Sequence, residues 1–212
     1  MPNQQKWNAQ FGGKAFFTSH AGIVLRSSKL EFVGQVKHYY KGQMIVAKVC
    51  YDKELTFTVI CIYAPVDADE NVCFWKWFAT LKFTGPILVL GDMNCVLNTK
   101  KDNYGTVKKA RKETPAFQAA LNAHDLIDGL ENNSNSASNI TRLFKQTGLV
   151  GKAGTRINFI LYSAFLRKAV KRVQPYEYPE SDYFPLTGTF VVNSVETATS
   201  YHNQKKRNLN FA

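Results

Sequence analysis

The sequence lacks any apolar run that approaches the roughly 18 residues needed for a transmembrane helix. Residues 1–8 are polar, so the apolar segment of a secretory signal peptide is missing there too. Acidic residues are few, because 16 Asp and Glu stand against 27 Lys and Arg, which leaves a net charge of +11. We therefore expect an intracellular protein, nuclear or cytoplasmic, with no membrane partner and a preference for polyanions such as nucleic acid.

Cysteine is scarce as well, with four residues and no CxxC pair. Two of the four lie inside apolar runs, where a reduced thiol behaves as a small hydrophobic side chain. The pattern predicts neither a disulfide framework nor a zinc site.

The basic residues gather in clusters at residues 108–112, 167–172 and 205–207. Any one of these clusters can be an ordinary solvated surface. Only their sum, together with the motifs below, argues for binding to nucleic acid.

The length of 212 residues, 45% of them hydrophobic, suits one core better than two. We expect a single domain over residues 1–193 and a polar, basic tail over residues 194–212, where apolar periodicity is lost. The polar segment 131–139 (ENNSNSASN) predicts a surface loop within the domain. No obligate protein partner is implied.

Strands are predicted where β-branched, aromatic and other apolar residues form short runs bounded by turn residues. These runs cover residues 22–26, 43–51, 56–64, 86–91, 155–161, 171–176 and 184–192. The run ILVL, at residues 87–90, is continuously apolar, as in a strand that is covered on both faces.

Two helices are predicted between the strands. The first spans about residues 67–81, with an apolar stripe of Val72, Trp75, Phe78 and Ala79. The second begins at Thr114, a residue that can cap, with Pro115 at the first helical position, and its apolar face is Phe117, Ala120, Leu121 and His124. His124 is expected to be a partly buried helix residue and not a metal ligand. Hairpins mixed with few helices favour an α/β sandwich over a doubly wound parallel sheet.

The segment PILVLGDMN, at residues 86–94, ends an apolar strand in a glycine and then presents Asp92 and Asn94. Residues two apart on an extended chain project to the same side, so an acid and an amide are placed together. They could orient a water and hold a phosphate oxygen. Gly-Asp-x-Asn is equally a good turn sequence, and that alternative stays open.

Three further segments place polar residues beside apolar strands. VICIYAP, at residues 59–65, presents Tyr63, which can donate to a phosphate or lie at the edge of the core. TRINFIL, at residues 155–161, and SDYFPL, at residues 181–186, are unremarkable when each is taken alone.

The order GIVLR, VICIYAP, ILVLGDMN, TRINFIL, SDYFPL resembles the endonuclease/exonuclease/phosphatase superfamily over about residues 7–192. Within it, the chain looks most like the endonuclease domains of non-LTR retrotransposons. The resemblance implies a four-layer α/β sandwich, in which two packed mixed β-sheets have helices outside. It also implies magnesium-dependent hydrolysis of a DNA phosphodiester.

The resemblance assigns roles to individual residues. It implies that Asp92 activates the attacking water, that Asn94 and Tyr63 contact the phosphate, and that Asp182 binds the metal. Thr141 and Arg156 are further candidates for substrate binding. We expect Asp92, Asn94, Tyr63 and Asp182 to meet in one cleft, with Asn158 and Tyr183 beside them.

The chain departs from the family pattern at three places. The closing Ser-Asp-His motif of the family has Tyr183 in place of its histidine, and the Arg-Ile-Asp motif has Asn158 in place of its aspartate. The family's first strand, with its metal-binding glutamate, has no counterpart before Glu31. We therefore expect the first strand to be missing, magnesium to bind weakly or not at all, and turnover to be low.

Three functions follow from these departures. The chain is expected to be a weakly active or inactive endonuclease domain of retrotransposon origin. The alternatives are a pseudoenzyme that binds nucleic acid without cleaving it, and a phosphatase or other phosphoesterase of the same fold. The positive charge suits nucleic acid better than a small phosphoester.

Overall fold

A computed structural model describes residues 9–105, 111–131, 139–144, 153–176 and 181–191. Its main element is a seven-stranded sheet whose strands are, in spatial order, β3 (Leu30–Phe32), β5 (Met44–Tyr51), β6 (Leu55–Tyr63), β7 (Ile87–Asp92), β12 (Asn158–Ser163) and β9 (Leu126–Asp128), with β4 (Lys37–Tyr39) also paired to β5. The β6–β7 pair is parallel and every other pair of this sheet is antiparallel. The sheet is therefore mixed, as expected for an α/β sandwich.

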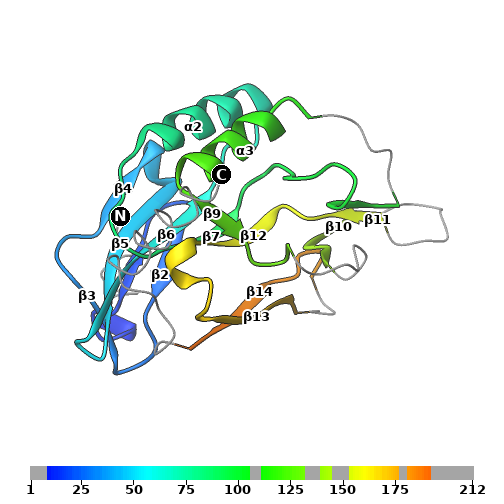
Figure 1. Ribbon diagram of the computed structural model, residues 1–212. Helices are drawn as coiled ribbons and strands as arrows, with labels where there is room; N and C mark the ends of the chain where they lie inside the picture. Colours follow the sequence, from blue (N-terminus) through cyan, green and yellow to red (C-terminus); the bar gives the residue numbers. More distant parts are fainter. Residues whose placement is uncertain (1–8, 106–110, 132–138, 145–152, 177–180, 192–212) are drawn as a thin grey trace, which may run out of the picture.

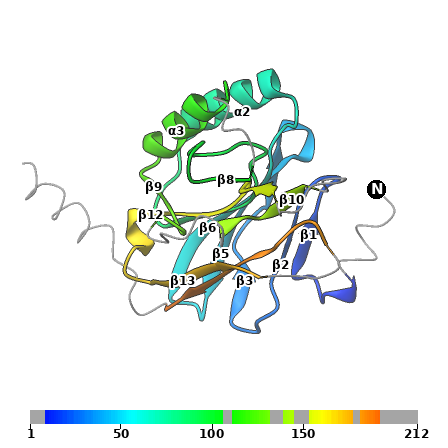
Figure 2. The ribbon, with the colours of Figure 1, turned by 90° about the vertical axis from the view of Figure 1, so that its right-hand side faces the viewer.

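Two helices, α2 (Ala68–Thr80) and α3 (Thr114–Ala123), cover one face of this sheet (Figure 1). Two small antiparallel pairs lie on the other face: β1 (Ala15–Phe17) with β2 (Gly22–Val24), and β13 (Val170–Pro175) with β14 (Leu186–Phe190). Figure 2 shows the same layering from the side. The expected sandwich is confirmed, but the described part of the second layer is divided into two antiparallel pairs and is not one mixed sheet.

A third small sheet has the order β10 (Arg142–Phe144), β11 (Ala153–Thr155), β8 (Asn103–Tyr104). Short 3-10 turns, η1 (Tyr40–Gly42) and η3 (Ala164–Leu166), join strands of the main sheet to their neighbours.

The apolar run of β7 is divided between the two faces of the main sheet. Val89 packs with the helices, whereas Leu88 and Leu90 pack against the second layer. Side chains alternate along a strand, so a strand covered on both sides needs apolar residues at every position. This confirms the prediction made from the run ILVL.

Helix α2 begins where the sequence predicts, because Asp67 accepts hydrogen bonds from the backbone N–H groups of Asp69 and Glu70 at 2.9 and 3.0 Å. Its buried residues are Asn71, Phe74, Trp75 and Phe78. The predicted Trp75 and Phe78 are confirmed, whereas Asn71 and Phe74 are buried where Val72 and Ala79 were predicted. The large aromatic side chains of this stripe meet the sheet, and Val72 and Ala79 are only partly buried.

Helix α3 confirms the predicted face formed by Phe117, Ala120 and Leu121. Thr114 is not the N-cap, because Glu113 takes that position and the Thr114 hydroxyl donates to the carbonyl of Val96 at 2.9 Å. His124 ends the helix, and its Nε2 lies 2.9 Å from the carbonyl oxygen of Phe78.

Each predicted strand run contains a strand, but the run over residues 155–161 is broken. β11 ends at Thr155 and β12 begins at Asn158, so Arg156 and Ile157 belong to neither strand. Short strands such as β8 and β10 were not predicted, because two or three residues carry too little periodicity. The predicted loop at 131–139 and the predicted tail at 194–212 lie largely or wholly outside the described residues.

The four cysteines are free thiols. None of the helices in the described ranges is long and apolar enough to cross a membrane.

Candidate functional site at the strand ends

Three strands of the main sheet end together. Tyr63 is the last residue of β6, Asp92 is the last of β7, and Asn158 is the first of β12. The strand register pairs Asp92 with Tyr63 on one side and with Asn158 on the other. The pairing therefore brings together three predicted site residues that lie far apart in the sequence. With Asn94 and Tyr183 they form what we call the strand-end site.

Gly91 allows the close approach of β7 to β6 directly before Asp92. Its φ of 143° lies in a region that L side chains rarely adopt, and an added Cβ would lie 1.9 Å from the carbonyl oxygen of Ile62. A backbone oxygen cannot rotate away as a side chain can, so only glycine fits. The glycine of the GDMN segment thus has a packing role that sets the position of Asp92.

Asp92 and Asn94 form a tight turn. The backbone N–H of Asn94 donates to Asp92 Oδ1 at 2.8 Å, and the Asn94 side-chain amide donates to the carbonyl of Ala64 at 2.7 Å. Asn94 has φ of 48°, a left-handed conformation that asparagine tolerates. The turn interpretation of this segment and the site interpretation are therefore compatible, since the turn itself fixes the carboxylate.

The loops that flank the site are tied to helix α2 by a buried asparagine. The Asn71 side-chain amide donates to the carbonyls of Pro65 and Met93 at 2.8 and 3.0 Å. One helix residue thereby fixes the chain that follows β6 and the chain that follows β7. Asn71 belongs to none of the sequence motifs, so its role was not predicted.

Burial raises the pKa of the Asp92 carboxyl above its ordinary value. The Asn94 N–H and the positive charge of Arg142 oppose this effect and lower the pKa in part. A carboxylate with a raised pKa is a stronger base than an exposed one, which suits the predicted activation of water.

Thr141 lies beneath the first residues of β12 and is completely buried. Its hydroxyl oxygen accepts hydrogen bonds from the backbone N–H groups of Ile157 and Asn158, both at 3.0 Å. We propose that Thr141 positions Asn158, because a fully buried hydroxyl with two internal donors is poorly placed to bind the substrate predicted for it.

Tyr183 approaches the site from a separate segment. It forms a β-bridge with Arg142, and the Arg142 guanidinium carbon lies 5.3 Å from the centre of the Tyr183 ring. The neighbouring Asp182 accepts a hydrogen bond from the Leu143 N–H through its backbone carbonyl at 2.7 Å. Burial is the main cause of a raised pKa of the Tyr183 hydroxyl; the charge of Arg142 opposes it, and the smaller effects of Asp92 and Asp182 add to the rise. The phenol therefore remains neutral near neutral pH.

Two residues of this region were missed by the sequence analysis. His20 lies in the turn between β1 and β2, and its ring is parallel to the Tyr63 ring, with 6.0 Å between centres. Arg142 lies beside Tyr183. Neither residue belongs to a recognisable motif, so the sequence carried no signal for either.

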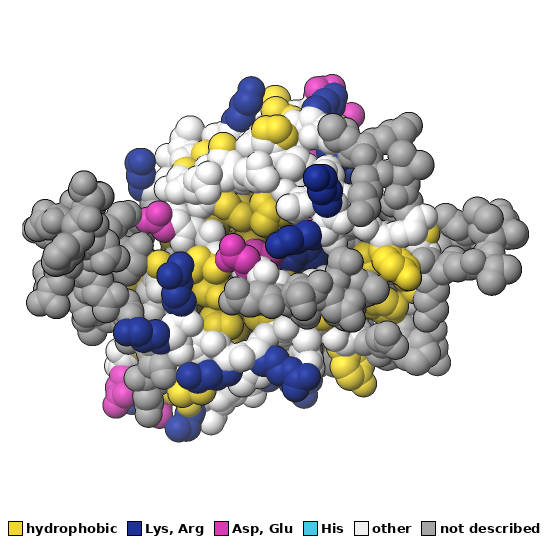
Figure 3. Space-filling model, turned by 45° about the vertical axis from the view of Figure 1, so that its right-hand side comes forward, with side chains coloured by type: hydrophobic (Ala, Val, Ile, Leu, Met, Phe, Trp, Pro, Cys, Tyr) yellow, Lys and Arg dark blue, Asp and Glu magenta, His cyan; other side chains and the backbone are white. Residues whose placement is uncertain are grey.

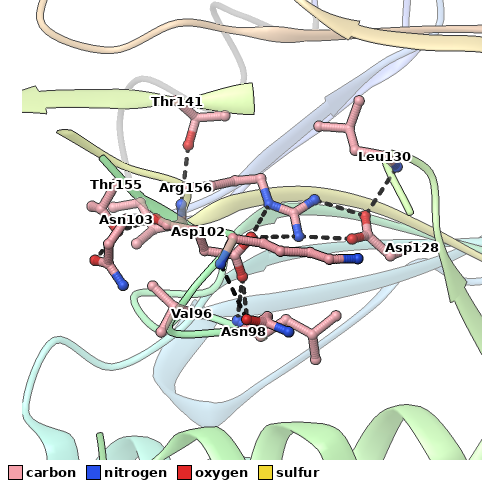
Figure 4. A network of polar contacts seen from close by, with 12 residues as sticks. Val96, Asn98, Asp102, Asn103, Asp128, Leu130, Thr141, Thr155 and Arg156 are labelled. Carbon is pink, nitrogen blue, oxygen red and sulfur yellow. Dashed lines mark hydrogen bonds and ion pairs between the residues drawn. The ribbon is translucent and has the colours of Figure 1, made fainter. Parts of the chain in front are cut away.

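Arg156 was predicted to bind substrate, but its guanidinium forms an internal network (Figure 4). Arg156 Nη2 lies 2.8 Å from Asp102 Oδ1 and 2.7 Å from Asp128 Oδ2. All three residues are buried. Burial lowers the pKa of Arg156, but the charges of Asp128 and Asp102 outweigh burial and raise it. We propose that Arg156 stabilises the fold and does not contact substrate.

A pocket of about 570 Å³ lies beside this network, between α3 and β9. Asp102, Asp128 and Arg156 line it, whereas Asp92, Tyr63 and Tyr183 do not. The chemistry predicted from the sequence points to the strand ends, so we place the candidate site there and not in this pocket.

The strand-end site has limited capacity for a metal ion. No group of three or more His, Cys, Asp or Glu side chains suited to a metal occurs in the described ranges. Mg²⁺ takes one or two carboxylates together with waters and substrate phosphate. Asp182, the metal ligand expected from the sequence, is a single carboxylate and supplies only part of such a ligand set.

No protein-family model matches the chain, and no curated protein matches its sequence. Solved structures do match. An AP endonuclease from Archaeoglobus fulgidus is 18% identical with a TM-score of 0.57, covering 77% of this chain and 79% of that one. The 3'-5' exonuclease NExo from Neisseria meningitidis is 24% identical with a TM-score of 0.56, covering 80% and 74%. The endonuclease domain of TRAS1, a telomere-specific non-LTR retrotransposon, is 13% identical with a TM-score of 0.61, covering 84% and 80%. The chain therefore has the endonuclease/exonuclease/phosphatase fold.

Proposed function

We propose that this chain, with its endonuclease/exonuclease/phosphatase fold, is an endonuclease domain of retrotransposon origin that binds a DNA phosphodiester at the strand-end site. We further propose that it hydrolyses the phosphodiester with little or no turnover. The observation that carries this proposal is the register that pairs Asp92 with both Tyr63 and Asn158.

The retained residues support binding and the first chemical step. Asp92 is a partly buried carboxylate at a strand end, with Oδ1 held by the Asn94 N–H. It can accept a proton from a water that attacks the phosphorus in line with the leaving oxygen. Tyr63 can donate a hydrogen bond to a phosphate oxygen.

The altered residues explain why turnover is expected to be low. Asn158 is an amide and cannot orient a neighbouring group through negative charge. Tyr183 is a neutral phenol and cannot supply the charge of a protonated imidazole. Loss of one such positioned donor commonly costs about 3 kcal/mol of transition-state stabilisation, or a hundredfold or more in rate.

Magnesium would be held by Asp182, and it would supply positive charge that stabilises the negative charge developing on the phosphate oxygens. A single carboxylate implies weak affinity, so waters and the substrate phosphate have to complete the coordination of the ion. Magnesium is therefore expected to bind after the DNA or together with it.

The surface charge supports DNA as the polyanion. Figure 3 shows Lys and Arg side chains spread over the visible face and not confined to one patch. The net charge is +11. The NExo structure from Neisseria described as a 3' phosphatase is bound to a product DNA hairpin, so a protein of this fold acts on DNA. Phosphate contacts make such binding steeply dependent on salt.

The experiment is plasmid nicking in the presence of magnesium. The wild-type chain, Asp92→Ala and the double variant Asn158→Asp with Tyr183→His are compared at equal concentration. We expect little nicking by the wild type, none by Asp92→Ala, and at least a tenfold gain in the double variant if the two changed residues are the main defect. DNA binding by all three is measured in parallel by fluorescence anisotropy.

Two outcomes would contradict the proposal. Robust, Asp92-dependent nicking by the wild type would overturn the low turnover. Absence of DNA binding by the folded wild type would overturn the function itself. Release of inorganic phosphate from a 3'-phosphorylated oligonucleotide, without nicking, would favour the phosphatase alternative.

A further inference from the structure

A cation that the motifs do not account for, Arg142, lies beside the strand-end site, against the Tyr183 ring. Arg142 belongs to β10, next to Thr141, whose hydroxyl holds the first residues of β12. Among the described residues Arg142 makes no ion pair, and its Nε is buried without a hydrogen-bond partner. A buried guanidinium donor without an acceptor is costly, so it calls for a ligand that supplies one.

The position of Arg142 is fixed by its surroundings. Its backbone pairs with Thr155 of β11 and bridges to Tyr183. The Tyr183 ring faces the guanidinium at 5.3 Å, within the range of a cation–π contact. A ring against one face of the guanidinium does not cover the N–H groups at its edge, and one of them, on Nε, has no hydrogen-bond partner.

The charge of Arg142 acts at the strand-end site. It lowers the pKa values of Asp92 and Tyr183 against the stronger effect of burial. Asp92 and Asp182 both bring negative charge to this region. An entering phosphodiester would be repelled by these carboxylates unless a cation stood beside them. Arg142 meets this need, and its planar donor fork matches two phosphate oxygens.

We propose that Arg142 binds the phosphate of the nucleic acid at the strand-end site, with the Tyr183 ring as the platform that orients its guanidinium. This rests on the proposed function, since it names the residue that recognises the phosphodiester. It also assigns a role to Tyr183, which is then a positioning residue for Arg142. The guanidinium brings its positive charge to the phosphate without the help of a metal ion.

The test measures binding of the full chain to a fluorescein-labelled DNA duplex in EDTA, at several salt concentrations. We expect Arg142→Gln to weaken binding about tenfold and to reduce the slope of log K against log salt by about 1. Arg142→Lys keeps the charge and loses the fork, so the slope should stay while affinity falls severalfold. Arg26→Gln is the matched control, because Arg26 is exposed and follows the end of β2 that is remote from the His20 turn.

The platform is tested through Tyr183. Tyr183→Ala should weaken binding severalfold, and Tyr183→Phe, which keeps the ring, should weaken it less. In the Arg142→Gln background, Tyr183→Ala should have no further effect, because the ring acts through the guanidinium. Circular dichroism and thermal melting establish that each variant is folded.

The outcomes separate this proposal from the proposed function. If the wild type binds and folded Arg142→Gln binds equally well with an unchanged slope, the role of Arg142 is overturned and the proposed function stands. If Arg142→Gln fails to fold, equal affinity of wild type and Arg142→Lys overturns the role of the fork. If the folded wild type does not bind DNA, both proposals fail.

Discussion

The backbone N–H of Asn94 donates a hydrogen bond of 2.8 Å to the Asp92 carboxylate, two residues earlier in the chain. This bond holds one carboxylate oxygen in a turn that is also tied to the end of β6 by the Asn94 side chain. The charge of Asp92 nevertheless opposes folding, because burial raises its pKa above the value in an unfolded chain.

Replacing Asp92 by Asn should therefore stabilise the protein at neutral pH while removing any hydrolysis. The folded state binds the Asp92 proton more tightly than the unfolded state does. Wild-type stability therefore falls as pH rises from the ordinary carboxyl pKa through the raised one. The asparagine oxygen can still accept from the Asn94 N–H.

Urea unfolding at neutral pH and at about pH 4 measures this difference. The advantage of the variant should be largest at neutral pH and shrink at the acidic value, where the wild-type carboxyl is protonated. Equal stability of the two proteins at neutral pH would contradict the prediction. The trade of stability for a buried charge is common at functional sites.

Gly91→Ala should destabilise the protein by about 2–4 kcal/mol, because the new Cβ meets a backbone oxygen that cannot move without separating β6 from β7. Gly85→Ala is the control. Gly85 also has positive φ, at 78°, but no atom lies within 4 Å of its added Cβ. That change should cost only about 1–2 kcal/mol. Chemical unfolding gives both values, and equal losses would show that the contact with Ile62 carries no cost.

Arg156→Met should cost about 3–5 kcal/mol, because it leaves the buried carboxylates of Asp102 and Asp128 without their cation. The exposed pair of Lys29 and Asp52, with Nζ 3.0 Å from Oδ2, provides a control, since Lys29→Met should change stability too little to measure. DNA affinity per folded molecule should be unaffected by Arg156→Met. A loss of affinity without a loss of stability would restore the substrate-binding role first predicted for Arg156.

Thr141→Val should destabilise the protein by about 1–3 kcal/mol, because the N–H groups of Ile157 and Asn158 lose their buried acceptor. Thr141→Ser keeps the acceptor and removes only a methyl group, so its loss should be about 1 kcal/mol. Thermal unfolding measures the two variants. If serine proves as damaging as valine, packing of the methyl group, and not hydrogen bonding, is what Thr141 supplies.

The local elements were open to prediction from the sequence because their causes are local. Asp67 caps α2 through its own neighbours, two and three residues on. The run ILVL requires cover on both faces wherever it is placed, and Gly91, Asp92 and Asn94 form a turn through contacts within a few residues. The order of five such segments sufficed to predict the sandwich and the strand that carries the carboxylate.

Residues that depend on distant contacts could not be assigned in this way. Arg156 resembles a substrate ligand in sequence, but Asp102 and Asp128, 54 and 28 residues away, neutralise it. The predicted strand over residues 155–161 is interrupted near Ile157 and Asn158. The backbone N–H groups of these two residues donate to the Thr141 hydroxyl and not to a neighbouring strand. His20 and Arg142 carry no motif, and only the meeting of separate hairpins and strands brings them to Tyr63 and Tyr183.

The sequence by itself determined the periodicity of the strands, the caps and turns, the excess of positive charge and the identity of the changed motif residues. The tertiary structure decided which of these residues meet. Periodicity and turn chemistry arise from the covalent spacing of neighbours, whereas the site arises from strand register and from charges that approach each other across the fold. For this reason Asp92 could be predicted from its own segment. Arg142, which lies against the Tyr183 ring, could not.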